Sequence, residues 1–208
     1  MIVTLVFGDK KQYKLQNFGL SIGLILSPVK NFTLDSNDVR YLKLVYSKLL
    51  NIPDLSFLDV PQTVEKFDCV KIGNVVIGSA ESRTTRNSYV LASWADKAGR
   101  IAGSADEAPI RSGAVNFYFR QRVKVKTCNP RAPEKIHIYM FYMARLNWYS
   151  EHPQKEAYGA HVQIWCNNFD SFGPGSFLPI QRINSQFAGV KVNHQREQVL
   201  LVETLPGY

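Results

Sequence analysis

The chain has 208 residues, of which 45% are hydrophobic and 20% are charged, and its formal net charge is +8. These fractions are typical of a folded globular protein and exclude wholesale disorder. The length suits one domain, or one domain with an appendage. The positive charge is concentrated, because residues 109–208 hold twelve Lys and Arg against six Asp and Glu. Such a surplus favours nucleic acid, an anionic membrane or an acidic protein as partner, although solubility alone is the alternative explanation.

The cysteines and the apolar runs indicate the cellular compartment of the protein and whether it contacts a membrane. Cys69, Cys128 and Cys166 are odd in number and contain no CxxC pair, which argues against a disulfide framework and a zinc ribbon. This predicts that the protein occurs in a reducing, intracellular compartment. The N-terminal apolar run has no basic region before it, and FGLSIGLIL is too short to cross a bilayer. We therefore expect a soluble protein with no membrane partner and no cofactor.

The first 64 residues predict a small α/β segment packed on the main domain. Residues 2–7 are strand-like, GDKK follows as a turn, and GLSIGLIL predicts a second strand that ends at Ser27-Pro28. One clear helix is predicted over about 35–50. The DSND run supplies a capping side chain, and apolar residues then recur at spacings of three and four. Asn51-Ile52-Pro53 ends the helix.

Residues 65–208 predict a barrel-like β domain. Runs rich in Val, Ile and aromatic residues are separated by turn residues, at Cys69–Ile77, Ser88–Trp94, Ala114–Thr127, Ile136–Tyr149, His161–Cys166, Phe187–Val192 and Gln198–Glu203. Short strands at this spacing are typical of a barrel or a strongly curved antiparallel sheet. The fold class is therefore mainly β. A small, polar, glycine-containing connection at residues 95–113 predicts a mobile loop.

The stretch GAVNFYFRQRVKVKT, residues 113–127, has the strongest functional pattern. Its odd positions are apolar from 115 to 125, except for Gln121. Its even positions include Tyr118, Arg120, Arg122, Lys124 and Lys126. A strand sends alternate side chains to opposite faces, so we expect one buried face and one basic face.

Two explanations of this basic face are open. Cations on every second residue lie about 7 Å apart, which approaches the spacing of phosphates along a nucleic-acid strand. Tyr118 would then stack on a base. Alternatively, the cations protect an exposed strand from edge-to-edge aggregation. The absence of any acid from Arg111 to Arg131 favours binding, because an ordinary solvated face mixes charges of both signs.

Two further sets are candidate binding residues. The loop SAESRTTRNS places Arg83 and Arg86 among hydroxyl groups, which suits a phosphate but equally suits an ordinary hairpin connection. The other set is aromatic and consists of Trp94, Trp148, Tyr149 and Trp165. These four side chains are expected in the core, and the alternative is an open cup for a methylated cation, as in a histone-peptide reader.

No catalytic residue and no metal ligand is predicted. The four histidines lie in no HxH or HExxH context, and the few carboxylates of the β-region lie near turns. A phosphoryl-transfer enzyme would need a cluster of acids around a metal ion.

Three segments in the second half of the chain occur in an order that resembles the order in a known family. LNWYSEHP at Leu146–Pro153 is followed by VQIWC and then by SFLPIQRINSQFAGVKV at Ser176–Val192. Over roughly Asp68–Val192 this order resembles the bromo-adjacent-homology (BAH) module of chromatin proteins, although the Arg-Pro-Glu-x-Thr corner and the Glu-Leu-Phe element of that family are absent. The layout is also similar to uncharacterised β-rich segments of proteins associated with mobile elements.

The BAH resemblance implies binding to a chromatin protein or to nucleosomal DNA, without catalysis, and implies the nucleus as a location. Together with the basic strand, it predicts a non-enzymatic nucleic-acid or chromatin-binding module. The alternative is a protein–protein interaction or histone-peptide reader module. A metal-dependent phosphoryl-transfer enzyme is the third hypothesis.

Overall fold

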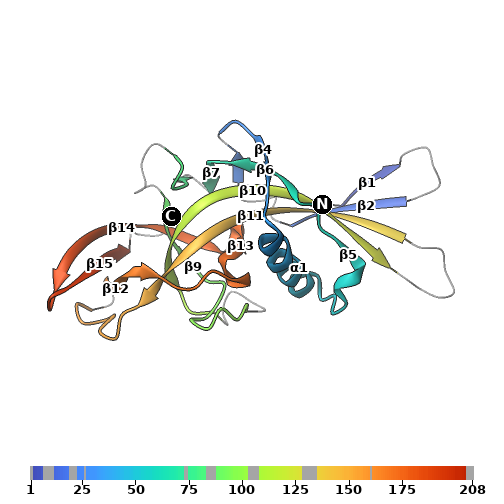
Figure 1. Cartoon of the computed structure of the whole chain (residues 1–208). Helices are drawn as coiled ribbons and strands as arrows, with labels where there is room; N and C mark the ends of the chain where they lie inside the picture. Colours follow the sequence, from blue (N-terminus) through green and yellow to red (C-terminus); the bar gives the residue numbers. More distant parts are fainter. Residues whose placement is uncertain are drawn as a thin grey trace.

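A computed structural model provides the fold (Figure 1). It describes residues 2–6, 12–18, 23–25, 27–72, 75–82, 88–102, 108–127, 135–159 and 161–204. These residues form a mainly β structure with one α-helix, α1 (Ser36–Leu50). The strands are β1 (Ile2–Val6), β2 (Gln12–Phe18), β3 (Gly23–Ile25), β4 (Lys30–Thr33), β5 (Leu58–Asp59), β6 (Thr63–Phe67), β7 (Cys69–Ile72), β8 (Val75–Gly78), β9 (Tyr89–Ala92), β10 (Arg111–Thr127), β11 (Lys135–Glu151), β12 (Val162–Phe169), β13 (Phe177–Pro179), β14 (Ile183–His194) and β15 (Glu197–Thr204). Short 3-10 turns are η1 (Leu55–Phe57), η3 (Pro174–Ser176) and η4 (Ile180–Arg182).

The two 17-residue strands β10 and β11 run through the whole fold. They pair antiparallel from Gly113↔Trp148 to Thr127↔Lys135. At one end, β11 pairs with β12, and the order β12-β15-β14-β9 returns to β10. All pairings in this ring are antiparallel, so six strands close a barrel (Figure 1). The predicted mainly β, barrel-like fold is confirmed.

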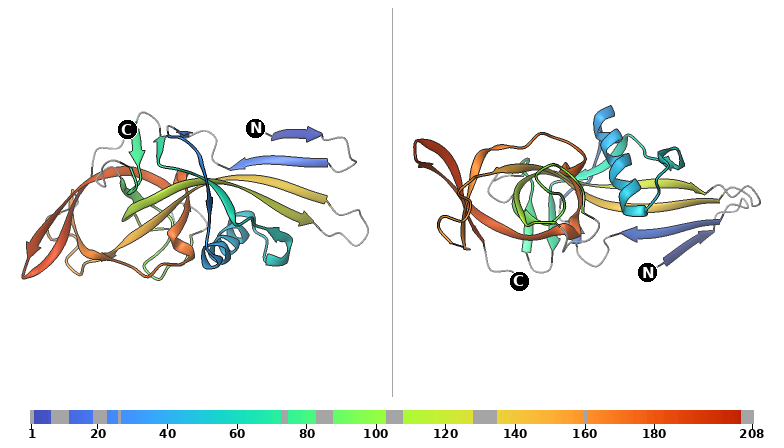
Figure 2. Two further views of the ribbon diagram at one scale, coloured as in Figure 1. Left: turned by 45° about the horizontal axis from the view of Figure 1, so that its top comes forward. Right: turned by 90° about the horizontal axis from the view of Figure 1, so that it is seen from below.

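The other ends of β10 and β11 extend beyond the barrel as an open sheet (Figure 2). On one edge β2 pairs parallel with β11, and β1 pairs with β2. On the other edge β5 and β6 pair with β10, and β4 pairs with β6. N-terminal strands thus supply both edges of this open sheet. The division into a segment 1–64 and a domain 65–208 stays a prediction.

Helix α1 covers one face of the open sheet. Its N-cap is Asp35, whose carboxylate accepts from the Asp38 N–H at 2.7 Å, and its C-cap is Asn51 in the left-handed conformation with φ of 54°. Tyr46 stacks on Phe141 of β11 with ring centroids 4.3 Å apart. The predicted helix, its caps and its apolar face are confirmed. In the described part of the chain, no helix is long and apolar enough to cross a membrane.

Several strand boundaries differ from the prediction. QYKLQNF forms β2, which was not predicted, and the described residues of the predicted strand GLSIGLIL, Gly23–Ile25, form β3. The predicted strand 69–77 is two paired strands, β7 and β8. Pro179 is the last residue of β13, and a 3-10 turn follows it, because proline lacks the N–H that a continuing ladder needs.

The predicted mobile loop at residues 95–113 is shorter than expected. Strand β10 already begins at Arg111, and an Ala95↔Ile101 bridge closes a turn at the start of the connection. Asp96 stabilises this turn by accepting from the Ala98 and Arg100 N–H groups, both at 2.9 Å. Residues 103–107 lie outside the described part of the chain.

Candidate functional site

The alternation in β10 separates two faces as predicted. The apolar odd positions are at most 3% exposed: Val115, Phe117, Phe119, Val123 and Val125. The polar exception, Gln121, is also buried, because its amide has partners at both ends. Its oxygen accepts from the Tyr46 hydroxyl of α1 at 2.6 Å, and its NH₂ donates to the Pro61 carbonyl.

Tyr118 was predicted to stack on a base, and the structure places it in the core. It is 0% exposed, and its ring stacks on Phe67 at 5.9 Å. Its hydroxyl donates to the Gly78 carbonyl at 3.4 Å, and Gly78 ends β8 of the small sheet β3-β7-β8. This small sheet covers the outer face of β10 at this point. The prediction for Tyr118 is therefore wrong.

Beyond Tyr118 the outer face of β10 opens toward solvent. Arg120 is half-buried, with 35% of its side chain exposed, and the next three cations are exposed. We call the four side chains the basic face: Arg120, Arg122, Lys124 and Lys126. They lie on the side of the open sheet opposite α1, so the prediction that they face solvent is confirmed for Arg122, Lys124 and Lys126, whereas Arg120 is half-buried.

Two acids from neighbouring strands meet the basic face. The Arg120 Nε donates to the Glu65 carboxylate on β6, and the Lys124 Nζ lies 3.5 Å from the Asp59 carboxylate on β5. The hydrogen bond to Glu65 raises the pKa of Arg120 further, so this side chain stays charged. These two carboxylates offset part of the positive charge of the basic face. Exposed ion pairs of this kind contribute only about 0–1 kcal/mol, so a phosphate can replace either carboxylate at small cost.

Each cation of the basic face stands directly opposite a residue of β11. The four cross-strand pairs are Arg120↔Tyr142, Arg122↔Met140, Lys124↔Ile138 and Lys126↔Ile136. These β11 side chains, the apolar row, are all half-buried. Sequence reasoning missed the apolar row, because β11 is apolar on both faces and only its register with β10 shows which residues flank the cations.

The second predicted set, Arg83 and Arg86, lies outside the described residues. A phosphate-binding role for that loop stays a prediction.

The aromatic cup is wrong, and the core interpretation is correct. Trp94 and Trp165 are 0% exposed, Tyr149 is 3% exposed and Trp148 is 4% exposed. They also divide between two hydrophobic clusters, with Trp94 and Trp148 in the main core and Tyr149 and Trp165 in a smaller one. The Trp148 Nε1 donates to the Gly175 carbonyl at 2.8 Å. No methylated cation can reach rings that are packed in this way.

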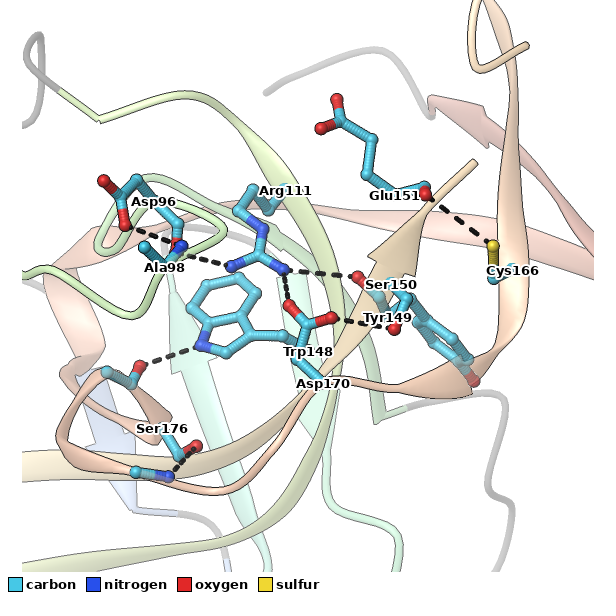
Figure 3. Close-up of polar contacts among 12 residues, drawn as sticks. Asp96, Ala98, Arg111, Trp148, Tyr149, Ser150, Glu151, Cys166, Asp170 and Ser176 are labelled. Carbon is cyan, nitrogen blue, oxygen red and sulfur yellow. Dashed lines mark hydrogen bonds and ion pairs between the residues drawn. The ribbon is translucent and has the colours of Figure 1, made fainter. Parts of the chain in front are cut away.

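A polar cluster that the sequence did not reveal lies where β10 enters the barrel (Figure 3). Arg111 is 4% exposed, and its guanidinium carbon lies 5.1 Å from the centroid of the Trp148 ring. It donates to the carbonyl oxygens of Asp96 at 3.0 Å and Tyr149 at 3.3 Å, and to the Asp170 carboxylate. A cleft of about 390 Å³ lies beside it. Because all these contacts are internal, Arg111 joins barrel elements.

A second, more open groove of about 1060 Å³ lies near the β14–β15 turn. His194 lines it and uses both ring nitrogens. Nδ1 lies 3.2 Å from the Tyr158 hydroxyl, and Nε2 lies 3.1 Å from the Gln154 side-chain oxygen. The ring therefore ties this turn to the loop after β11.

The described residues contain no group of three or more His, Cys, Asp or Glu side chains that could hold a metal ion. Burial raises the pKa of the Cys69 and Cys166 thiols, which keeps both protonated near neutral pH.

Comparisons with known proteins found no matching family model, no matching curated protein and no matching solved structure. The basic face, with its two carboxylate partners and the neighbouring apolar row, is the candidate site that the geometry itself provides.

Proposed function

We propose that this protein is a non-enzymatic nucleic-acid-binding module and that phosphates bind along the basic face. The observation that carries the proposal is the uncovered outer face of β10 beyond Tyr118, where four cations occur at every second residue. Their repeat of about 7 Å suits successive phosphates of one strand. Arg122 can hold a phosphate in a bidentate way, whereas the lysines act as point charges.

The two carboxylates set the number of contacts that are available. If Arg120 and Lys124 exchange Glu65 and Asp59 for phosphates, four cations contact the ligand. If they do not, fewer cations contact the ligand. The proposal includes nucleosomal DNA as a source of the ligand, which the resemblance of residues 68–192 to the BAH module would imply.

A salt titration of binding tests the proposal. Each phosphate contact with duplex DNA changes the slope of log K against log [salt] by about −0.9, so four contacts predict about −3.6 and two predict about −1.8. Fluorescence anisotropy with labelled oligonucleotides between about 50 and 200 mM salt measures this slope.

Substitutions then locate the contacts. Changing Arg122→Gln and Lys126→Gln together should make the slope about 2 less negative and weaken all sequences alike, because phosphate contacts have no base preference. Lys191→Gln is the matched control, because Lys191 is an exposed strand cation on β14, outside the basic face. Glu65→Gln frees Arg120 from its competitor and should strengthen binding.

Two results contradict the proposal. One is the absence of binding to any nucleic acid at low salt, and the other is a double variant with the slope of the wild type. In either case the cations are better explained as protection of an exposed strand, and the protein-interaction hypothesis takes the place of this one.

A further inference from the structure

The basic face and the apolar row form a ladder of four equivalent pairs. Each pair joins one cation of β10 to one apolar or aromatic residue of β11, and the register that aligns them has no irregularity over this stretch. Directly opposite side chains on one face of an antiparallel pair have Cβ atoms about 5 Å apart, and successive pairs lie about 7 Å apart. A cation and an apolar or aromatic side chain thus lie side by side at four successive positions.

The apolar row keeps accessible surface, as His137 and Tyr139 between its members also do, whereas β11 is buried at Phe141 and beyond Tyr142 at Met143 and Ala144. Phe141 and Met143 point to the α1 side and are 1% and 0% exposed, and Ala144 is also 0% exposed. In contrast, Ile136, Ile138, Met140 and Tyr142 are all half-buried. Removing the remaining apolar surface from water is favourable by about 25 cal/mol per Å², so a ligand that covers the row gains from it.

We infer that the nucleic acid is single-stranded, with its phosphates along β10 and its bases over the apolar row, where Tyr142 is the stacking residue. This inference rests on the proposed function. Each nucleotide of a single strand offers one phosphate and one flat apolar base, which are the two partners that each pair of the ladder requires. A duplex hides the base faces inside its own stack and would press sugar and phosphate against the apolar row.

The test compares three ligands of equal length, about eight nucleotides: an oligothymidylate, an abasic oligomer with the same phosphates, and a duplex. Wild-type protein should bind the oligothymidylate about tenfold more tightly than the abasic oligomer. Tyr142→Leu keeps an apolar side chain in the sheet and should remove most of this preference, with the salt slope unchanged. Tyr142→Phe keeps the ring and should keep the preference.

Tyr158→Leu is the matched control, because Tyr158 is 55% exposed and lies in the loop after the C-terminal end of β11, whereas the ladder lies in the N-terminal half of that strand. It should change neither the preference nor the slope. Circular dichroism of each variant confirms that the fold is retained.

The outcomes separate this inference from the proposed function. Equal binding of the abasic oligomer and the oligothymidylate, with a salt slope that still depends on Arg122, overturns the inference and leaves the proposed function intact. A preference for the duplex does the same. Absence of binding to all three ligands overturns both, and binding to anionic lipid vesicles in their place identifies the ladder as a lipid-binding surface.

Discussion

The two ends of the β10–β11 hairpin have different surroundings. At the barrel end, both faces of the hairpin are covered, and even an arginine is buried. At the open end, α1 covers one face (Figure 2), and the other face has the exposed cations at 122, 124 and 126 and the half-buried apolar row. Alternation therefore predicts which residues share a face, whereas the covering elements decide whether that face meets water.

Arg111 and Arg122 show this difference within one strand. Arg111 is 4% exposed and donates to two carbonyls and the Asp170 carboxylate, whereas Arg122 is exposed. A buried guanidinium with all-protein partners contributes to the structure, and an exposed one is available to a ligand. The predictions below test whether stability and binding divide between the two ends.

The largest loss of stability is expected at Tyr118, and Tyr142 on the same face of the hairpin serves as the comparison. Tyr118→Ala should lower the free energy of unfolding by about 3–5 kcal/mol, because it empties a fully buried aromatic site. Tyr142→Ala should cost about 1 kcal/mol or less, as expected for one half-exposed cross-strand pair. Denaturant unfolding at constant temperature measures both values. Equal costs would mean that the small sheet β3-β7-β8 does not cover Tyr118 in solution.

Removing Arg111 should have the next largest effect. Arg111→Met keeps much of the side-chain volume but leaves Asp170 and two carbonyls without their donor. Loss of one partner from a buried ion pair typically costs about 3–5 kcal/mol, and we expect about 3 because the Asp170 side chain is 26% exposed. A second substitution, Asp170→Asn, should recover part of the loss in the same unfolding experiment. If Arg111→Met alone is neutral, the cluster in Figure 3 contributes no stability.

Local patterns were enough to predict the helix and the faces of β10. A capping aspartate, a spacing of three and four, and a period of two each act between near neighbours in the chain. The strand β2 was not predicted because Asn17 breaks its alternation of polar and apolar residues.

Features that depend on distant segments could not be predicted. Gln121 can be buried because its side chain hydrogen-bonds to Tyr46. Tyr46 lies 75 residues away in the sequence, so no local pattern shows this contact. Tyr118 is buried because β8 and its neighbours fold over it. The acids that meet the basic face, Glu65 and Asp59, reach it only through the order of strands in the sheet. The exposure of the cations at 122, 124 and 126 was therefore predicted correctly and that of Tyr118 was not, whereas binding at the cations stays a prediction.

Alkaline unfolding probes the buried tyrosines. Burial raises the pKa of Tyr46 and Tyr118 well above 10.0 in the folded protein. Their contribution to stability is thus fully present below about pH 10 and is lost as pH rises, because the unfolded chain releases a proton that the folded chain retains. Above about pH 10, each of these two tyrosines lowers the free energy of unfolding by about 1.4 kcal/mol per pH unit.

Tyr46→Phe should therefore reduce the slope of stability against pH above pH 10 by about 1.4 kcal/mol per unit. At neutral pH the same substitution should cost about 1–2 kcal/mol, because the Gln121 oxygen loses its donor. Denaturant unfolding of the wild type over the same pH range gives the reference slope. A Tyr46→Phe slope equal to the wild-type slope would show that Tyr46 ionises freely in the folded state.

The smallest effect on stability should come from the open end. Arg122→Ala and Lys126→Ala each remove an exposed side chain from a strand that stays paired with β11, so each should change the free energy of unfolding by less than about 0.5 kcal/mol. The same variants should produce the largest change in the salt dependence of nucleic-acid binding. Arg122 and Lys126 should thus affect binding and not stability, whereas the loss of Arg111 should destabilise the barrel. A stability cost above about 1 kcal/mol at Arg122 would instead mean that the cation serves the fold, as Arg111 does.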